Sequence, residues 1–317
     1  MHWKELKMRY LLWRIKPDVV HVHWAGFAHP VARAWSGPLV VTAYGSDIYR
    51  LAEQPNNVIS QSVVGLNAAN VITCDSEDLK QRIRELQGRD QNSIHVVQWG
   101  VDTKAFFPAR PGRSLMSELN VTTQPVVFSP RHITPLYNQK MIISAFALVV
   151  KQVRGAVLIL KHYRKDADYF QSVRAHIDDL GLADSVRFAG TVPYEKMAEF
   201  YRMAPITVSV PLSDATPMSV LEAMACGSVP VVSDLPSLRE WIRDGWNGYL
   251  VSPQDSEALA QRIVHLLKHR DVANTYSGRN LQIIKEKASQ DAHMAYMADI
   301  YHAVTTSALR LAKVNIG

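Results

Sequence analysis

Apolar and polar positions alternate along this 317-residue chain with two distinct periods. Short apolar runs rich in β-branched residues predict buried strands, and longer stretches with apolar positions three and four residues apart predict helices. We expect about four strands before residue 107 and about six after it. Because strands and helices alternate regularly, the pattern predicts parallel sheets that are covered by helices on both faces.

The expected strands fall into two groups, 19–24, 38–43, 71–74 and 94–98, and then 125–129, 156–161, 186–189, 206–210, 229–233 and 248–251. The main expected helices span 2–16, 25–35, 58–70, 76–87, 140–153, 169–180, 194–203, 216–226, 237–244, 256–269 and 290–308. We therefore predict two doubly wound α/β domains. The first comprises residues 1–107 with about 290–317, the second comprises 108–289, and the Pro- and Arg-containing stretch 107–113 is the expected linker.

One strand–turn–helix unit carries most of the chemical information. The strand at 206–210 is bounded by prolines and is followed by Thr216, a residue that can cap a helix, and by Pro217, which suits a first helical position. The amide end of such a helix forms an anion site, and Asp214 and Glu222 flank it. A phosphorylated ligand with hydroxyl groups, such as a sugar nucleotide, fits this arrangement. Ordinary α/β core is the alternative interpretation of the same segment.

The amino-acid composition indicates the broad class of the protein. The chain is 47% hydrophobic and 20% charged, and its two cysteines, Cys74 and Cys226, lie far apart in apolar segments. This usage predicts buried thiols in a reducing compartment rather than disulfides. Since we find neither an apolar run of membrane-spanning length nor a secretory signal, we expect a cytoplasmic protein.

The net charge of +6 is compatible with nucleic acid, an anionic membrane or a phosphorylated substrate. No nucleic-acid-binding motif is recognisable, so we expect no nucleic-acid partner. Residues 2–16 combine basic with aromatic and aliphatic side chains at helical spacing. The pattern favours packing of this helix on the first sheet, and it is also compatible with peripheral contact with anionic lipid at the inner face of the plasma membrane.

Other chemistry finds weaker support. His21 and His23 share one face of a strand, which permits a metal pair, but no cysteine or carboxylate cluster joins them, so we predict no metal. Neither a Gly-x-Ser-x-Gly nucleophile motif nor a phosphate-binding Walker loop is present. Trp99 and Trp246 are candidates for stacking on a base or a sugar.

Several short motifs occur in a characteristic order along the chain. They are PDVVHVH at 17–23, TAYGSD at 42–47, GVD at 100–102, Arg131 after a strand, VRFAG at 186–190, SDATPMSVLEAMACG at 213–227 and GWNGYLV at 245–251. The ordered set resembles the retaining glycosyltransferases of family 4, also called glycosyl transferases group 1, over nearly the whole chain. The resemblance implies a GT-B fold, two Rossmann-like domains facing across a cleft, with the first part of the N-terminal domain lacking.

The resemblance also implies roles for individual residues. Arg131 would pair with the donor diphosphate and Glu222 would accept from the ribose of the nucleotide. Asp214 and the backbone after it would hold the donor sugar, and that backbone comprises Ala215, Thr216, Pro217 and Met218. Gly190, Thr191 and Val192 would contact the base, and Tyr44, Gly45 and Asp47 would approach from the acceptor side. The donor is a UDP- or GDP-sugar, and neither a cofactor nor an enzyme nucleophile is implied.

The chain departs from the family pattern at several positions. Asp214 stands where the family has Glu, although its separation from Glu222 is that of the family. Tyr137 occupies the place of a lysine that neutralises the diphosphate, with Lys140 the nearest lysine, and Tyr44 replaces a histidine. The loss of one charge-assisted contact costs about 1.5–3 kcal/mol.

Two functional hypotheses remain open. The first, which we favour, is an enzyme of polysaccharide biosynthesis that transfers a hexose to a glycan or a lipid-linked acceptor. The second is a degenerate, non-catalytic nucleotide-binding remnant or interaction subunit, which the shortened first domain and the missing lysine favour. A GT-B epimerase is a more distant third.

Overall fold

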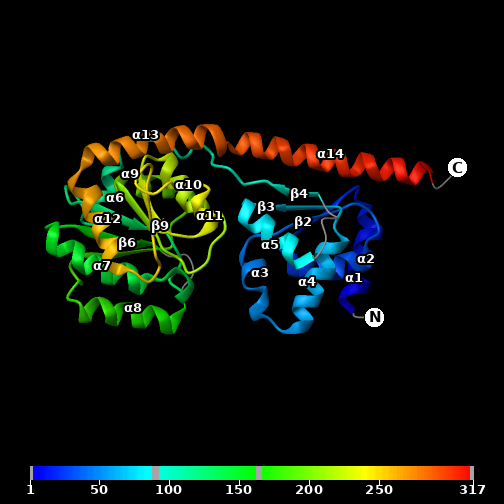
Figure 1. Ribbon diagram of the computed structural model, residues 1–317, viewed down its shortest axis with the longest axis horizontal. Coiled ribbons are helices and arrows are strands. Elements are labelled where there is room, and N and C mark those ends of the chain that lie inside the picture. The colour runs from blue at the N-terminus through cyan, green and yellow to red at the C-terminus, as the bar shows by residue number, and fades with distance from the viewer. Residues whose placement is uncertain (1–2, 88–92, 162–165, 315–317) are drawn as a thin grey trace. The chain divides into compact units, whose positions relative to one another are not determined.

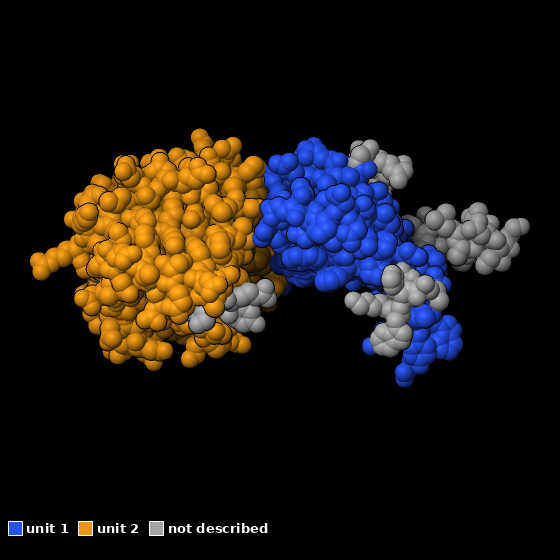
Figure 2. Space-filling view, turned by 90° about the horizontal axis from the view of Figure 1, so that it is seen from below, with its two compact units in different colours: residues 1–99, 291–317 blue, residues 100–290 orange. Residues whose placement is uncertain are grey.

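The computed structural model describes residues 3–87, 93–161 and 166–314. The chain forms two compact units, which Figure 2 shows in different colours: unit 1 consists of residues 1–99 and 291–317, and unit 2 of residues 100–290. Residues 100–107, which the sequence pattern assigns to the first domain, lie in unit 2 because Val101 and Phe106 are buried in its core.

Unit 1 contains a parallel sheet of four strands in the order β1-β2-β3-β4 (Figure 1). The strands are β1 (Val20–His23), β2 (Leu39–Thr42), β3 (Val71–Cys74) and β4 (Ser93–Val96). The helices are α1 (Trp3–Ile15), α2 (Ala28–Ala34), α3 (Ser46–Tyr49), α4 (Asn56–Ala68), α5 (Glu77–Gln87) and α14 (Gln290–Val314). The last helix covers one face of the sheet, where Met297, Ile300 and Val304 are buried together with Val40, Val71 and Val97.

Unit 2 contains a parallel sheet of six strands in the order β10-β9-β8-β5-β6-β7. The strands are β5 (Val126–Ser129), β6 (Val157–Lys161), β7 (Val186–Gly190), β8 (Ile206–Ser209), β9 (Val229–Ser233) and β10 (Tyr249–Val251). The helices are α6 (Arg113–Glu118), α7 (Gln139–Gln152), α8 (Ala167–Asp179), α9 (Met197–Met203), α10 (Met218–Ala225), α11 (Pro236–Arg239), α12 (Ser256–Lys268) and α13 (Arg270–Lys287). The sequence predicted four and six strands, and both numbers are confirmed.

Both faces of the second sheet are buried, because alternate residues of each strand point to opposite sides. Val127 of β5 packs in the core that α7, α8 and α12 cover, whereas Val126 and Phe128 pack in the core under α9 and α10. The strand order reverses between the neighbours β5 and β8. Loops that leave the carboxyl ends of two such strands diverge to opposite faces and open a crevice, the usual ligand position in doubly wound sheets.

Some local predictions were wrong. The helix α6 begins within the expected linker, and α13 was not expected at all. Its buried residues are Ala273, Tyr276, Asn280 and Ile284. They have helical spacing, but the pattern is hidden because Asn280 is polar, and its amide is satisfied by Asn247.

The chain passes between the units twice, and within unit 2 the two passing segments lie side by side. The Val101 amide donates to the Ala288 carbonyl at 2.7 Å, and the Gln290 amide donates to the Val101 carbonyl at 3.4 Å. Gly100 has φ +68°, and a Cβ there would stand 2.5 Å from the backbone of Gln290. The close approach therefore requires glycine at this position.

Candidate functional site

The predicted donor residues follow the carboxyl ends of adjacent strands in unit 2. Arg131 comes two residues after β5, and Asp214 lies in the loop between β8 and α10. Glu222 lies on α10 and Lys161 ends β6. Because these strands are neighbours in a parallel sheet, the side chains gather at one edge, beside the point where the strand order reverses.

A fixed ion pair forms the centre of this site. Arg131 Nη2 lies 2.7 Å from Asp214 Oδ2, and the two side chains are only 11% and 17% exposed. Arg131 Nη1 donates to Ser219 Oγ at 3.1 Å, and the guanidinium stands 4.4 Å from the centre of the Tyr137 ring. Contacts from three elements thus hold the guanidinium in one position, and Tyr137, the residue in place of the expected lysine, is one of them.

Burial and the neighbouring groups shift the pKa values of Asp214 and Arg131 in opposite directions. Burial raises the pKa of Asp214, although Arg131 and the Ala215 amide, which donates to Oδ1 at 3.1 Å, both favour the ionised form. Burial alone would lower the pKa of Arg131, but Asp214 and Tyr137 raise it overall, so the guanidinium stays charged. Beyond the ion pair, no group in the described part of the chain donates a hydrogen bond to Asp214 Oδ2.

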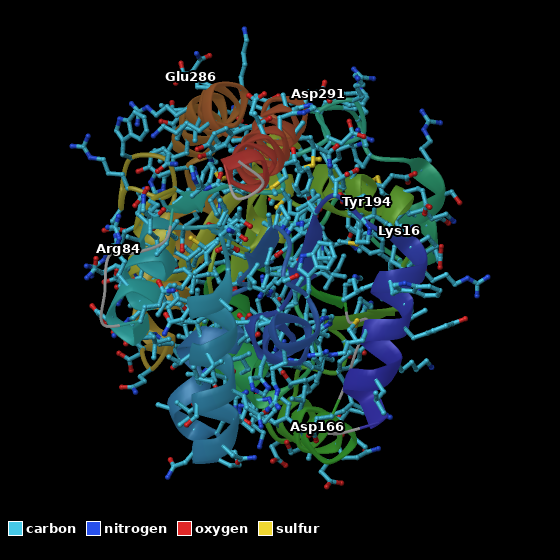
Figure 3. All side chains as sticks on the ribbon, turned by 90° about the vertical axis from the view of Figure 1, so that its right-hand side faces the viewer. Lys16, Arg84, Asp166, Tyr194, Glu286 and Asp291 are labelled. Carbon is cyan, nitrogen blue, oxygen red and sulfur yellow. The ribbon has the colours of Figure 1, made fainter. Side chains whose placement is uncertain are left out.

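Two tyrosines hold Glu222, which is 6% exposed. The Tyr194 hydroxyl donates to Oε1 and the Tyr201 hydroxyl to Oε2, each at 3.0 Å (Tyr194 is labelled in Figure 3). Burial raises the pKa of Glu222, and the two hydroxyls and Lys161 oppose that rise. A carboxylate offers about four lone-pair positions, so Glu222 can still accept from a ligand.

The Arg131–Asp214 ion pair and Glu222 are electrostatically connected through Tyr201. Burial and Glu222 raise the pKa of Tyr201, while the charge of Arg131 lowers it. The buried Tyr201 hydroxyl therefore lies within the fields of both groups. Ser219, which contacts Arg131, and Glu222 belong to the same helix, so Arg131, Asp214 and Glu222 line one region of unit 2.

The start of α10 differs from the prediction. The helix begins at Met218 after Pro217, and Thr216 does not cap it. The Thr216 hydroxyl instead accepts from Trp241 Nε1 at 3.3 Å, which pins the loop before the helix. Ser237 Oγ holds the same loop by donating to the Asp214 carbonyl at 2.8 Å.

The remaining predicted donor residues lie around this centre. Gly190 ends β7 with φ +65°, Thr191 is exposed, and Val192 packs against the unit 2 core two residues before Tyr194. Lys140 lies in the first turn of α7, where its backbone amide donates to the Tyr169 hydroxyl at 3.4 Å.

The acceptor-side prediction concerns a loop of unit 1. Gly45 has φ +94°, and both Asp47 oxygens accept backbone amides, from Ala25 at 2.7 Å and from Tyr44 at 2.9 Å. Burial raises the pKa of Asp47 against these bonds. Burial and the charge of Asp47 raise the pKa of Tyr44 to about 12, so its hydroxyl keeps its proton at neutral pH. Asp47 therefore holds the loop in position, whereas Tyr44 has a side chain that is available to contact a ligand.

His21 and His23 have protein partners. His21 Nδ1 lies 2.6 Å from the Tyr301 hydroxyl and Nε2 lies 2.6 Å from Thr42 Oγ1, and burial together with His23 lowers its pKa to about 4. Within residues 3–87, 93–161 and 166–314, no three His, Cys, Asp or Glu residues are grouped as a metal site would require.

The sequence interpretation missed four residues of the site, Lys161, Tyr194, Tyr201 and Ser219. Tyr194 and Tyr201 are seven residues apart on one helical stretch, which places them on the same face and could have signalled a shared partner. Lys161 ends a strand beside β5, the position at which a polar group reaches the crevice.

A doubly wound parallel sheet whose strand order reverses once is the architecture of a Rossmann-like domain. Sequence profiles agree over both units. The profile of the family Glycosyl transferases group 1 matches residues 114–282, and that of Glycosyltransferase Family 4 matches residues 1–105. The chain belongs to the group 1 glycosyltransferases of family 4 and has the GT-B fold.

The relatives are distant in sequence, but the alignments cover most of this chain. The chain is 24% identical over 308 residues to the N-acetyl-alpha-D-glucosaminyl L-malate synthase of Bacillus anthracis, covering 94% of this chain and 78% of that protein. It is 29% identical over 271 residues to a D-inositol 3-phosphate glycosyltransferase of Acidothermus cellulolyticus, covering 79% of this chain and 59% of that protein. The chain thus spans between about three fifths and four fifths of the length of these two relatives.

Solved structures share the fold. The sucrose-phosphate synthase of Thermosynechococcus elongatus superimposes with a TM-score of 0.85 at 18% identity, covering 96% of this chain and 77% of that one. Anabaena HepE in complex with UDP-glucose gives a TM-score of 0.85 at 19% identity, covering 94% and 82%.

Proposed function

We propose that this protein transfers a hexose from a nucleoside diphosphate sugar to a glycan or a lipid-linked acceptor, with retention of the anomeric configuration. The observation that carries the proposal is the gathering of Arg131, Asp214 and Glu222 beside the β5–β8 crevice of unit 2. The UDP-glucose complex of HepE, which has the same fold, supports the choice of ligand.

Each group has a partner in the donor. A guanidinium has five N–H donors, and the contacts with Ser219 and Asp214 engage two of them, so Arg131 retains donors for diphosphate oxygens. The amide end of α10 lies beside the pair and favours the same negative charge. Asp214 Oδ2 accepts a sugar hydroxyl, and Glu222 accepts a ribose hydroxyl with its remaining lone pairs.

The chemical step follows from these charges. As the bond between the anomeric carbon and the diphosphate breaks, the leaving group gains negative charge, which Arg131 and the α10 amides stabilise without a metal ion. A donor of this kind contributes about 10²–10³-fold to the rate. The acceptor hydroxyl attacks from the face that the leaving group vacates, its proton passes to a phosphate oxygen of the donor, and no enzyme nucleophile takes part.

The test is turnover of a panel of UDP- and GDP-hexoses, with and without glycan acceptors, followed as release of the free nucleotide. We expect release from at least one donor and a product with the anomeric configuration of the donor. No release from any donor, even by hydrolysis, together with calorimetric binding of UDP or GDP would favour the non-catalytic alternative. Nucleotide release with an altered free sugar would identify an epimerase.

The proposal includes a place of action at anionic lipid. The structure confirms a helix at α1, with no helix of the described chain long and apolar enough to cross a membrane. Leu6, Tyr10 and Trp13 are 46%, 54% and 71% exposed and share one face of α1, with Lys7 and Arg14 beside them. An exposed aromatic stripe with basic neighbours is typical of a helix that lies in a lipid interface.

In Figure 3, α1 (blue) ends near Lys16, and side chains extend from this helix away from the ribbon. We expect the protein to sediment with phosphatidylglycerol vesicles but not with neutral phosphatidylcholine vesicles. The double variant Leu6→Ser, Trp13→Ser should lose this binding. Equal binding of variant and original protein would contradict the assignment to α1.

A further inference from the structure

A cavity of about 820 Å³ lies at the amino ends of the strands in unit 1. Leu39 and Val71, the first residues of β2 and β3, line it, and α14 contributes Ile300, Ala303 and Val304. The transfer chemistry proposed above takes place at the carboxyl ends of strands, so this cavity lies at the opposite end of the sheet. Its volume is within the range of ligand sites.

The polar groups of the cavity do not favour a charged ligand. His95 Nδ1 lies 2.5 Å from the Tyr296 hydroxyl, and burial lowers the pKa of His95, so the ring is neutral at neutral pH. Among the described residues that line the cavity, Asp299 is the one side chain charged at that pH, and it is exposed on α14. An apolar group therefore fits this space better than an anion does.

An open groove adjoins the cavity and extends to α1. It has a volume of about 400 Å³ and is lined by Arg9, Trp13 and Lys16, and Trp35 and Ser36 line both the groove and the cavity. The helix α1 packs against α2 at this place. A ligand in the groove thus has the cavity next to it, on the other side of Trp35.

The Trp35 ring between the two spaces has a defined position. Its Nε1 donates to the Pro38 carbonyl at 2.9 Å. A Cβ at Gly37 would overlap the indole, so only glycine leaves room for the ring where it lies. The boundary between groove and cavity is therefore an apolar ring held in place, past which a hydrocarbon chain can pack.

The groove carries positive charge beside exposed apolar surface. Arg9 and Lys16 are both exposed, and neither is paired with a carboxylate within the described residues. Arg9 instead donates to the Arg33 carbonyl at 2.9 Å, which leaves further N–H donors of its guanidinium. Trp13 beside them is 71% exposed. Two cations at an apolar groove match a phosphate group that is attached to a hydrocarbon chain.

We infer that unit 1 binds one anionic phospholipid, with its phosphate at Arg9 and Lys16 and one acyl chain packed along Trp35 into the cavity at the amino ends of β2 and β3. This lipid is an anchoring ligand and not the acceptor, because the cavity is remote from the carboxyl ends of the strands. The inference deepens the lipid contact proposed for α1 and rests on that contact for the source of the ligand. It adds a specific site for a single molecule to adsorption on a surface.

Calorimetry with monoacyl phosphatidylglycerols of increasing chain length, below their micelle concentrations, tests the inference on the full chain. We expect the affinity to rise about fourfold for each added methylene until the cavity is filled, as burial of hydrocarbon predicts. Glycerol 3-phosphate, the head without a chain, should give no measurable binding. An affinity that does not depend on chain length would overturn the inference, as would binding of glycerol 3-phosphate alone.

A variant that fills the cavity tests where the chain lies. Ala303 is exposed on α14 and lines the cavity, so Ala303→Phe occupies the space without disturbing the core. We expect the affinity for the longest chain to fall at least about tenfold and the dependence on chain length to flatten. Ala295→Phe makes the same change at an exposed position of α14 outside the cavity and should bind as the original protein does. Equal loss in both variants would overturn the placement.

A second variant tests the phosphate position. The double variant Arg9→Gln, Lys16→Gln should lose the preference for monoacyl phosphatidylglycerol over the zwitterionic monoacyl phosphatidylcholine and keep the dependence on chain length. Lys268→Gln, at an exposed position of unit 2, is the control and should keep the preference. An unchanged preference in the double variant would contradict the assignment of Arg9 and Lys16.

Vesicle sedimentation and nucleotide release separate this inference from the proposed function. If the protein sediments with phosphatidylglycerol vesicles but binds no monoacyl lipid, the cavity site is wrong and the contact through α1 stands. If it binds monoacyl lipid but does not sediment, the cavity site stands and the peripheral contact fails. Release of nucleotide from soluble donors is measured without lipid, so its failure bears on the transferase proposal alone.

Discussion

The two units place different chemistry at the same kind of sheet edge. In unit 2 the strand order reverses between β5 and β8, and the residues that follow those strands form a buried ion pair. In unit 1 the order runs β1-β2-β3-β4 without reversal, and the corresponding residues are aromatic rings with neutral hydrogen-bond partners. One fold type thus supports an anion site in one unit and an apolar stacking surface in the other.

The comparison shows which part of a site depends on topology. Where the strand order reverses, the loops that follow the two strands diverge, and in unit 2 Arg131 and Asp214 from these loops form an ion pair. In unit 1 the described strands follow one another without reversal, and the rings of Trp24, Tyr44 and Trp99 lie after their carboxyl ends. Charge in unit 2 and ring surface in unit 1 can therefore be altered independently, and the following variants test that separation.

Arg131→Lys should have the largest effect. A lysine keeps the charge but cannot reproduce the two contacts that the guanidinium makes with Ser219 and Asp214. We expect kcat/KM for the donor to fall by about 10²–10³-fold. Steady-state nucleotide release measures this. Arg239→Lys, at an exposed pair with Asp234, is the control and should change the rate less than about twofold.

Glu222→Gln should weaken binding of the nucleotide while leaving the fold intact. The loss of a charged acceptor for ribose costs about 1.5–3 kcal/mol, or about 10–100-fold in Kd by calorimetry. Burial raises the pKa of Glu222, so the native state binds more protons than the unfolded chain between the ordinary and the raised pKa, and stability falls as pH rises through that window. At neutral pH we therefore expect the variant to melt at the same or a higher temperature.

A clearly lower melting temperature of Glu222→Gln at neutral pH would contradict this account. It would show that the hydrogen bonds from Tyr194 and Tyr201 stabilise the charged Glu222 more than burial destabilises it. Val220→Ala, on the same helix, removes a fully buried apolar side chain and provides the destabilised reference.

Variants of Tyr137 test whether its ring supports the Arg131 guanidinium or whether the site only lacks the charge of a lysine there. The ring stands 4.4 Å from the Arg131 guanidinium, a cation–π contact worth about 0.5–2 kcal/mol. Tyr137→Ala should lower kcat/KM about 2–30-fold, and Tyr137→Phe should retain most of the activity. If Tyr137→Phe is as impaired as Tyr137→Ala, the hydroxyl and not the ring acts on the arginine or the donor.

The smallest effect concerns unit 1 alone. Because burial lowers the pKa of His21 to about 4, the unfolded chain binds more protons than the native state between about pH 6.5 and 4. The stability that neutral His21 contributes is present above pH 6.5 and is lost as pH falls through this window. His21→Leu should flatten the pH dependence of unfolding there, whereas His302→Leu, at an exposed position on α14, should not.

The sequence predicted much of the fold because buried parallel strands are continuous apolar runs. All ten strands in the described residues overlap the expected ranges, whereas helix ends differ more, since α2 begins at Ala28 and α11 ends at Arg239. In α13, Asn280 occupies a buried position, and the bond to Asn247 that makes this tolerable joins residues 33 positions apart. No local pattern reveals such a pairing.

The candidate site was predictable to the extent that motifs fix positions along the chain. Arg131 and Asp214 stand in order in the sequence, but their contact at 2.7 Å depends on β5 and β8 being neighbours. The two tyrosines on Glu222 and the convergence of Trp24, Tyr44 and Trp99 also depend on tertiary arrangement. Spacing in sequence carries no information on which connections meet at a sheet edge.

The hydrogen bond between Val101 and Ala288 has a consequence for how the gene can be divided. Both ends of unit 2 meet at this bond. Residues 100–290 are therefore the natural boundaries for expressing unit 2 alone. Unit 1 cannot be obtained by a single stop codon near residue 99, because the product would lack α14 and leave Val40, Val71 and Val97 uncovered. A short artificial peptide joining residues 99 and 291 would be required instead.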